Sequence, residues 1–176
     1  MRAIGIVGWS GAGKTSLIAR LLPELIRRGL SVSTIKHTHH DVDIDRPGSD
    51  SHVHRTSGAR ETLLASPTRL ALAREHRGAP EPTLAELLGL LAPVDLVLIE
   101  GFKRERHRKI EVFRQANGKP PLWPDDAHIV AVVGDLTPAD GRPPGAALDD
   151  TKAVADLVIH HAEDVSDLIP RLRTGA

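Results

Sequence analysis

A glycine-rich stretch near the start of the chain has the spacing of a phosphate-binding loop, Gly-x-x-x-x-Gly-Lys-Thr. Glycines let backbone amides turn inward around phosphates, and the start of a following helix adds partial positive charge. Lys14 would contact the β- and γ-phosphates and take part in catalysis, while the Thr15 hydroxyl would coordinate Mg²⁺. The predicted nucleotide-binding residues are Gly8, Trp9, Ser10, Gly11, Ala12, Gly13, Lys14, Thr15 and Ser16.

An acidic residue is expected beside this loop, at the carboxyl end of a neighbouring strand, where open α/β sheets place their sites. Asp95 and Glu100 flank one apolar strand, and at roughly 3.3 Å per residue they lie about 16 Å apart, so only one can face the phosphates. Glu100 lies at the carboxyl end and is the predicted catalytic residue, which binds Mg²⁺ or orients the attacking water. A solvated strand end is the alternative interpretation.

Strands and helices must alternate to position these residues. Apolar runs predict strands at 3–7, 31–35, 96–99, 110–113 and 129–133, and a hairpin from strands at 61–65 and 69–73. Helices are expected at 15–28, at 83–91, from about 150, and at 163–172, although 157–159 could instead be a strand. Residues 38–57 are polar and aperiodic and are expected to form a long loop.

This element order predicts an α/β fold of the P-loop NTPase type, with a mostly parallel sheet, flanking helices and an additional hairpin. A single nucleotide-binding domain is expected over residues 1–176. Lys plus Arg equals Asp plus Glu, at 23 each, and the chain has two Trp, two Phe and no Tyr, so nucleic-acid binding is not expected. The absence of cysteine excludes thiolate chemistry. No apolar run approaches about 18 residues, so no membrane span is expected, and we predict a cytoplasmic protein.

Several further blocks carry a family resemblance. They are Lys36-His37-Thr38-His39-His40, Asp45-x-Pro47-Gly48-x-Asp50-Ser51, Gly58-Ala59, Ile99-Glu100-Gly101-Phe102-Lys103 and Lys109-Ile110-Glu111-Val112. Together with the phosphate-binding loop, they resemble the molybdopterin-guanine dinucleotide biosynthesis adapter proteins, known as protein B of that pathway. The resemblance is thin after Asp135.

The resemblance implies a GTP-binding adapter, with GTP and Mg²⁺ as cofactors and weak GTPase activity at most. It further implies a homodimer whose partner is a molybdopterin guanylyltransferase. That enzyme joins a guanosine monophosphate unit to molybdopterin.

A histidine-rich segment follows the second predicted strand, at the same sheet edge as the phosphate-binding loop. Lys36, His37, His39 and His40 are predicted contacts to phosphate or molybdopterin, in a loop that orders when nucleotide binds. Asp45 could then approach Mg²⁺. A zinc or nickel site that uses His37 and His39 is one alternative, and a solvated polar loop is another.

Two more sets of candidates follow the strands at 96–99 and 129–133. Lys103 and Arg108 belong to a basic run that could clamp an anionic pterin phosphate or meet an acidic partner, and a solvated turn is the alternative. The Asn-Lys-x-Asp guanine reader cannot exist, because Asn117 is the only asparagine. Asp135 is therefore the predicted acceptor for guanine N1–H and N2–H₂, with an ordinary loop acid as the alternative.

Two rival functions would use the same phosphate-binding loop. The histidine-rich segment would suit a metal-delivery GTPase. The basic run over residues 104–108 would suit the arginine lid of a small-molecule kinase.

Overall fold

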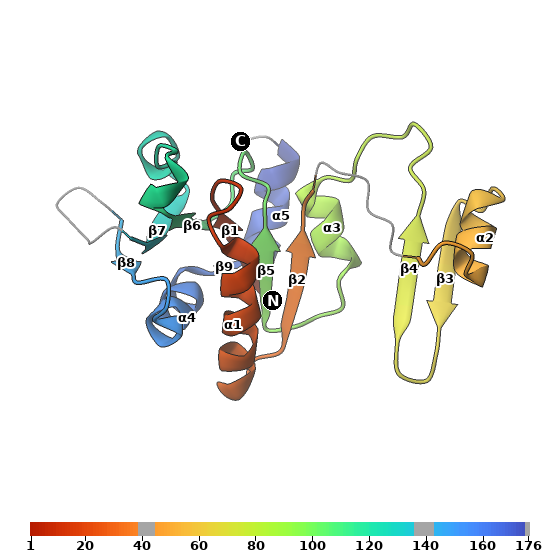
Figure 1. Cartoon of the computed structure of the whole chain (residues 1–176), viewed down its shortest axis with the longest axis horizontal. Coiled ribbons are helices and arrows are strands. Elements are labelled where there is room, and N and C mark those ends of the chain that lie inside the picture. The colour runs from red at the N-terminus through yellow and green to blue at the C-terminus, as the bar shows by residue number, and fades with distance from the viewer. Residues whose placement is uncertain (39–44, 136–142, 175–176) are drawn as a thin grey trace. The chain divides into compact units, whose positions relative to one another are not determined.

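The computed structural model describes residues 1–38, 45–135 and 143–174. The chain divides into two compact units, both drawn in Figure 1. Met1–His37 and Thr83–Ala176 form the main unit, and Thr38–Pro82 form the second unit. Each unit is described by itself below, and the single domain expected over 1–176 stays a prediction.

A mostly parallel sheet forms the centre of the main unit (Figure 1). In spatial order its strands are β2 (Val32–Lys36), β5 (Leu96–Glu100), β1 (Arg2–Val7), β6 (Lys109–Phe113), β7 (Ile129–Gly134) and β8 (Gly145–Ala146). Because β6 begins beside Gly5, the first residues of β1 have an open edge, where the short antiparallel β9 (Glu163–Asp164) pairs. The parallel strands expected from apolar runs are confirmed, whereas β8 and β9 were not predicted.

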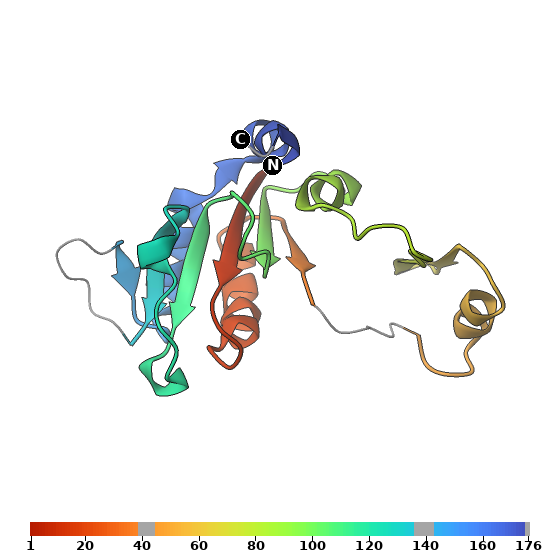
Figure 2. The ribbon, with the colours of Figure 1, turned by 90° about the horizontal axis from the view of Figure 1, so that it is seen from above.

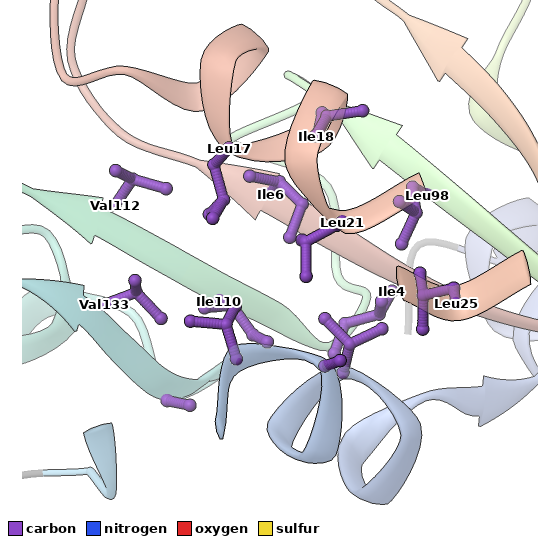
Figure 3. Close-up of a cluster of buried hydrophobic side chains, with 14 of the residues drawn as sticks. Ile4, Ile6, Leu17, Ile18, Leu21, Leu25, Leu98, Ile110, Val112 and Val133 are labelled. Atoms are coloured by element: carbon purple, nitrogen blue, oxygen red, sulfur yellow. The ribbon is translucent and has the colours of Figure 1, made fainter. Parts of the chain in front are cut away.

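Helices cover both faces of this sheet (Figure 2). One face is covered by α1 (Lys14–Arg27) and α4 (Thr151–His161), and the other by α3 (Leu84–Leu90) and α5 (Val165–Thr174). Figure 3 shows the apolar layer beneath α1, which includes Ile4, Leu17, Leu21 and Ile110. Each such buried aliphatic side chain contributes roughly 1.5–3 kcal/mol relative to an exposed one.

The helix boundaries follow local capping signals. α3 begins with the capping box that the sequence predicts, in which Thr83 and Glu86 exchange side-chain to backbone hydrogen bonds. Asp150 caps α4 by accepting from the backbone N–H of Ala153 at 3.0 Å. Residues 157–159 belong to α4, so the alternative of a strand there is wrong. No helix within the described ranges is long and apolar enough to span a membrane.

The second unit corrects one expectation. Residues 38–57 were expected to lack regular structure, but Asp50–Thr56 form the helix α2. Ser49 caps it by accepting from the backbone N–H of His52, and Asp50 lies favourably in the first turn. A helix of seven residues is too short to repeat an apolar stripe, so periodicity gave no signal. β3 (Glu61–Ala65) and β4 (Leu70–Arg74) form the predicted hairpin.

Candidate nucleotide-binding site

The phosphate-binding loop lies between β1 and α1, as its sequence predicts. Gly8 has a φ of 143°, and a Cβ there would lie 2.4 Å from the carbonyl oxygen of Val112 in β6, so only glycine fits. Lys14 reaches back across the loop and donates from Nζ to the carbonyl oxygens of Gly8 and Trp9, both at 3.0 Å. Burial, and then the cation of Lys103, lower the pKa of Lys14. The lysine is thus held among loop groups and other cations, where an arriving phosphate would be its strongest partner.

Two oxygen donors meet beside this loop. The hydroxyl of Thr15 donates to Oε1 of Glu100 at 2.8 Å. Glu100 is buried at the carboxyl end of β5, opposite Ile6 of β1, and so ends level with the start of the loop. A hydroxyl and a carboxylate are the hard oxygen ligands that Mg²⁺ prefers, so the residues fit this cation. Asp95, at the other end of β5, instead accepts from the Ser31 hydroxyl at 2.6 Å.

Lys36 lies at the same place because of strand register. In the parallel pair of β2 and β5, Lys36 is directly opposite Glu100. Its Nζ lies 3.6 Å from Oε1 of Glu100 and 3.5 Å from Oγ1 of Thr15. The structure therefore brings Lys14, Thr15, Lys36 and Glu100 together at one edge of the sheet.

The basic run after β5 divides between two places. The Nζ of Lys103 lies 4.6 Å from the centroid of the Trp9 ring, a cation–π contact on the phosphate-binding loop. Arg108 is not brought to this loop, because its guanidinium donates to the carbonyl oxygen of His161 at 3.5 Å. It lines a cavity with Arg2, Glu163 and Asp164.

Buried residues at the end of the same run fix the crossover between β5 and β6. Lys109 is fully buried, and its Nζ donates to the carbonyl oxygens of Lys103 and Glu105, both at 2.9 Å. The same Nζ lies 2.6 Å from Oδ2 of Asp126. Burial lowers the pKa of His107 to about 3, so this ring is neutral at physiological pH. These two side chains therefore shape the crossover rather than offer charge to a ligand.

The histidine-rich segment is described only in part. The ring of His37 stacks on Phe102, with centroids 4.5 Å apart and planes 29° apart. His39 and His40 lie outside the described residues. Asp45 belongs to the second unit, where its carboxylate accepts from Nε of Arg55 at 3.2 Å. Within residues 1–38, 45–135 and 143–174, no group of three or more His, Asp or Glu side chains is arranged to hold a metal ion.

Asp135 holds a turn beside the phosphate-binding loop. Its Oδ2 accepts from the backbone N–H of Gln115 at 3.0 Å, in the short 3₁₀ turn η1 (Gln115–Asn117) that follows β6. From this turn Asn117 donates to the carbonyl oxygen of Ser10 at 3.4 Å. The guanidinium of Arg114 lies over Gly13. Sequence reasoning missed both residues as site candidates, although Arg114 directly follows a predicted strand, the same signal that identified Glu100.

Glu111 supports the loop from below. It is fully buried, and its carboxylate accepts from the backbone N–H groups of Leu122 and Trp123, at 2.9 and 3.0 Å. Burial raises the pKa of Glu111. The segment that Glu111 holds includes Pro120, whose carbonyl oxygen accepts from Nε1 of Trp9 at 2.8 Å. Glu111, which belongs to the block Lys109–Val112 that carries the family resemblance, is thereby connected to the phosphate-binding loop.

Comparisons with known proteins find relatives of this chain in one family. A family model described as molybdopterin guanine dinucleotide synthesis protein B matches residues 3–135. The molybdopterin-guanine dinucleotide biosynthesis adapter protein of Escherichia coli is 39% identical over 159 residues, which cover 89% of this chain and 90% of the relative. The protein of the same name from Haemophilus influenzae is 41% identical over 132 residues, which cover 73% of this chain and 72% of the relative.

A solved structure shares the fold as well. The crystal structure of a molybdopterin-guanine biosynthesis protein B aligns with a TM-score of 0.68 at 29% identity, and the alignment covers 90% of this chain and 98% of that one. The predicted α/β fold and the predicted resemblance are both confirmed. The chain belongs to the molybdopterin guanine dinucleotide synthesis protein B family.

Proposed function

We propose that this chain binds GTP with Mg²⁺ at its phosphate-binding loop and, as a homodimer in the cytoplasm, assists a molybdopterin guanylyltransferase. As a member of its family, the chain is an adapter protein in molybdopterin guanine dinucleotide biosynthesis. The proposal concerns what it contributes there. One observation carries it: the Thr15 hydroxyl and the Glu100 carboxylate meet at 2.8 Å beside a complete phosphate-binding loop.

Binding begins with an exchange of partners by Lys14. Its ammonium leaves the carbonyl oxygens of Gly8 and Trp9 and donates to the β- and γ-phosphates, while loop amides donate to the same oxygens. Thr15 and Glu100 would hold Mg²⁺, which would supply positive charge against the phosphates. The chain thereby fixes the triphosphate in one orientation.

Slow hydrolysis is the expected chemistry at this site. A water would attack the γ-phosphorus, the bond to the β–γ bridging oxygen would break, and GDP and phosphate would leave. Glu100 is the group that orients this water or the cation. Its carboxylate already accepts from Thr15 and lies beside Lys36, so part of its accepting capacity is in use, in keeping with weak GTPase activity at most.

Contacts to molybdopterin and to the base complete the proposal. Lys36 lies beside Glu100, Lys103 contacts Trp9 and His37 stacks on Phe102, and these three are the proposed contacts to an anionic pterin phosphate. His39, His40 and Asp45 remain proposed contacts of the same loop, with Asp45 toward Mg²⁺. Arg108 is a proposed contact to the partner enzyme. Asp135 would read guanine with Oδ1, since Oδ2 binds Gln115.

The hairpin of the second unit supports the proposed homodimer. Cross-strand pairing of Leu63 with Leu72, and of Ala65 with Leu70, sets these side chains on one face. Leu63 and Leu70 are 60% and 68% exposed. A two-stranded hairpin is marginally stable alone in water, so an apolar face of this kind favours association with a second copy.

The dependence of GTP affinity on Mg²⁺ tests the role proposed for the Thr15 and Glu100 pair. In titration calorimetry, Mg²⁺ should strengthen GTP binding by the wild-type chain, and Thr15→Val should remove that gain while it keeps the side-chain shape. Thr174→Val is the matched control, because that hydroxyl donates to carbonyls of its own helix. An equal gain from Mg²⁺ in Thr15→Val and wild type would contradict the proposed site.

A further inference from the structure

We propose that Arg114 is a phosphate-binding residue, which holds the phosphates that GTP and GDP share. The observation is its position over the phosphate-binding loop. A Cβ built on Gly13 would lie 3.5 Å from a terminal nitrogen of the Arg114 guanidinium, 3.7 Å from Nε and 3.8 Å from Cζ. The guanidinium therefore lies beside Gly13, which directly precedes the first residue of α1.

The backbone of Arg114 is fixed in this place from two directions. Arg114 directly follows β6 and precedes η1, and its carbonyl oxygen accepts from the backbone N–H of Asn117 at 3.1 Å. The next residue, Gln115, is bound by the Asp135 carboxylate at the end of β7. Asn117 then reaches the loop itself through the carbonyl oxygen of Ser10. The sheet and the turn therefore fix the point from which the Arg114 side chain extends toward Gly13.

Electrostatics indicates what this guanidinium is for. The loop presents inward amides and the positive end of α1. Lys14 is repelled by the cations of Lys103 and Lys36 and attracted by one carboxylate, that of Glu100. A further cation beside such a loop raises its positive potential. In the described parts of the chain, the Arg114 side chain has neither a hydrogen bond nor an ion pair with another protein group. A phosphate anion is the ligand that this arrangement favours, and a guanidinium can donate to it through two N–H groups at once.

The position relative to Glu100 identifies which phosphates are involved. β5 and β6 pair with opposite edges of β1, and Glu100 ends β5 while Arg114 follows β6. The Mg²⁺ ligands, and with them the outer phosphates, therefore lie toward β5. Arg114 lies on the β6 side, against the residue before α1, where the amides of the first helical turn bind the inner phosphates. Both GTP and GDP carry those groups.

The inference rests on the proposed nucleotide binding and can be tested apart from it. Titration calorimetry with GTP, GDP and ATP should be run on the whole chain for wild type, Arg114→Ala and Arg114→Lys, with Arg173→Ala as a matched exposed control. Arg114→Ala should weaken GTP and GDP by the same factor, about tenfold or more. If the wild type binds ATP, the affinity for ATP should fall by the same factor. Arg114→Lys should recover part of the loss, because the charge returns without the two-pronged donor.

Each other outcome overturns the inference. Unchanged GDP affinity in a folded Arg114→Ala would show that Arg114 does not contact the phosphates. A loss of affinity for GTP alone would show that Arg114 contacts the γ-phosphate instead. A loss for guanine nucleotides with ATP binding intact would make Arg114 a base reader instead. If Arg114→Ala does not fold, Arg114→Lys with wild-type affinity for every nucleotide and Arg114→Gln with the same affinity would contradict the role. Wild type that binds no nucleotide would sink the proposed function as well.

Discussion

Glu100 combines three relationships in one buried carboxylate. It ends β5, it accepts the Thr15 hydroxyl at 2.8 Å, and it faces Lys36 across the parallel pair at 3.6 Å. A carboxylate so buried needs polar partners of this kind. The ammonium of Lys36 must therefore share Glu100 with any divalent cation that binds there, which makes this residue the most sensitive point of the site.

Glu100→Gln is expected to lower GTP hydrolysis and to leave the affinity for GTP measured without Mg²⁺ largely intact. Glutamine keeps an oxygen that accepts from Thr15, but it removes the charge that would hold Mg²⁺ or orient water. Phosphate release under single-turnover conditions, with affinity measured in parallel, checks both halves. Asp95→Asn at the far end of β5 is the control and should hydrolyse GTP at the wild-type rate. Unchanged hydrolysis in Glu100→Gln would place that residue outside the site.

Local patterns predicted some of the site residues but not others. Lys14 and Thr15 belong to a contiguous motif, and Glu100 was expected because it ends an apolar strand. Lys36 could be placed only on the sheet edge, since its partner depends on the register of β2 against β5. Arg114 was not predicted as a site residue, because its position depends on a hydrogen bond between Gln115 and Asp135, which are twenty residues apart. Spacing could not reveal that one oxygen of Asp135 supports this turn.

The crossover between β5 and β6 shows how an irregular segment becomes rigid. It contains no helix, and it packs directly against β1. A Cβ on Gly5 would lie 2.4 Å from Nε2 of His107 and 2.7 Å from Cγ of Lys109. Those two side chains fill the space above Gly5, and Lys109 binds the crossover carbonyls from beneath. Lys103 is thereby held where it contacts Trp9.

Gly5→Ala is therefore expected to destabilise the main unit. Overpacking of a close contact costs typically about 1–3 kcal/mol, which lowers the melting temperature by roughly 2–4 °C per kcal/mol in a chain of this size. Gly89→Ala is a matched control in α3, where the described residues beyond the adjoining turns of the helix place no atom within 4 Å of the added Cβ. That control should raise the melting temperature, because alanine favours a helix by about 1 kcal/mol over glycine. Calorimetric melting that is identical for Gly5→Ala and wild type would contradict the close packing.

The elements divide in the same way between local and distant causes. The strands of the parallel sheet were predicted because each carries a continuous apolar run, and α1 because six apolar residues repeat at helical spacing. α2 was missed because its seven residues include a single large apolar side chain, Val53. β8 and β9 have two residues each and exist only through pairing with β7 and β1. No local pattern records such pairing.

Taken as a whole, the chain joins the unit that carries the phosphate-binding loop to a small unit with an apolar sheet face. The main unit has apolar layers on both faces of its sheet, between β1 and the two helix pairs. Within its described residues, the second unit has α2 and a two-stranded hairpin, and α2 packs on β3. Leu63, Leu70 and Leu72 remain exposed on the hairpin. The second unit is too small to bury much apolar surface by itself, and a homodimer that buries this face would supply the missing apolar contacts.

Leu70→Glu is expected to dissociate the proposed dimer. Leu70 is 68% exposed, so the change costs the folded protomer little, but a charge buried without a partner strongly opposes association. Sedimentation equilibrium should find a dimer for wild type and a monomer for Leu70→Glu. Leu90→Glu, at the end of α3 and 60% exposed, is the control and should remain dimeric. A dimeric Leu70→Glu would move the interface to another surface, and a monomeric wild type would remove the dimer.

Guanylation of molybdopterin by a purified guanylyltransferase tests the central claim most directly. Yield is measured with the transferase alone, with wild type added, and with Lys14→Ala added. Lys14→Ala should bind GTP at least about tenfold more weakly, because a charge-assisted phosphate contact contributes roughly 1.5–3 kcal/mol. Lys152→Ala, in α4, is the matched control. The account predicts that wild type and Lys152→Ala raise the yield and that Lys14→Ala does not; an equal rise with Lys14→Ala would contradict a role for bound GTP in the adapter.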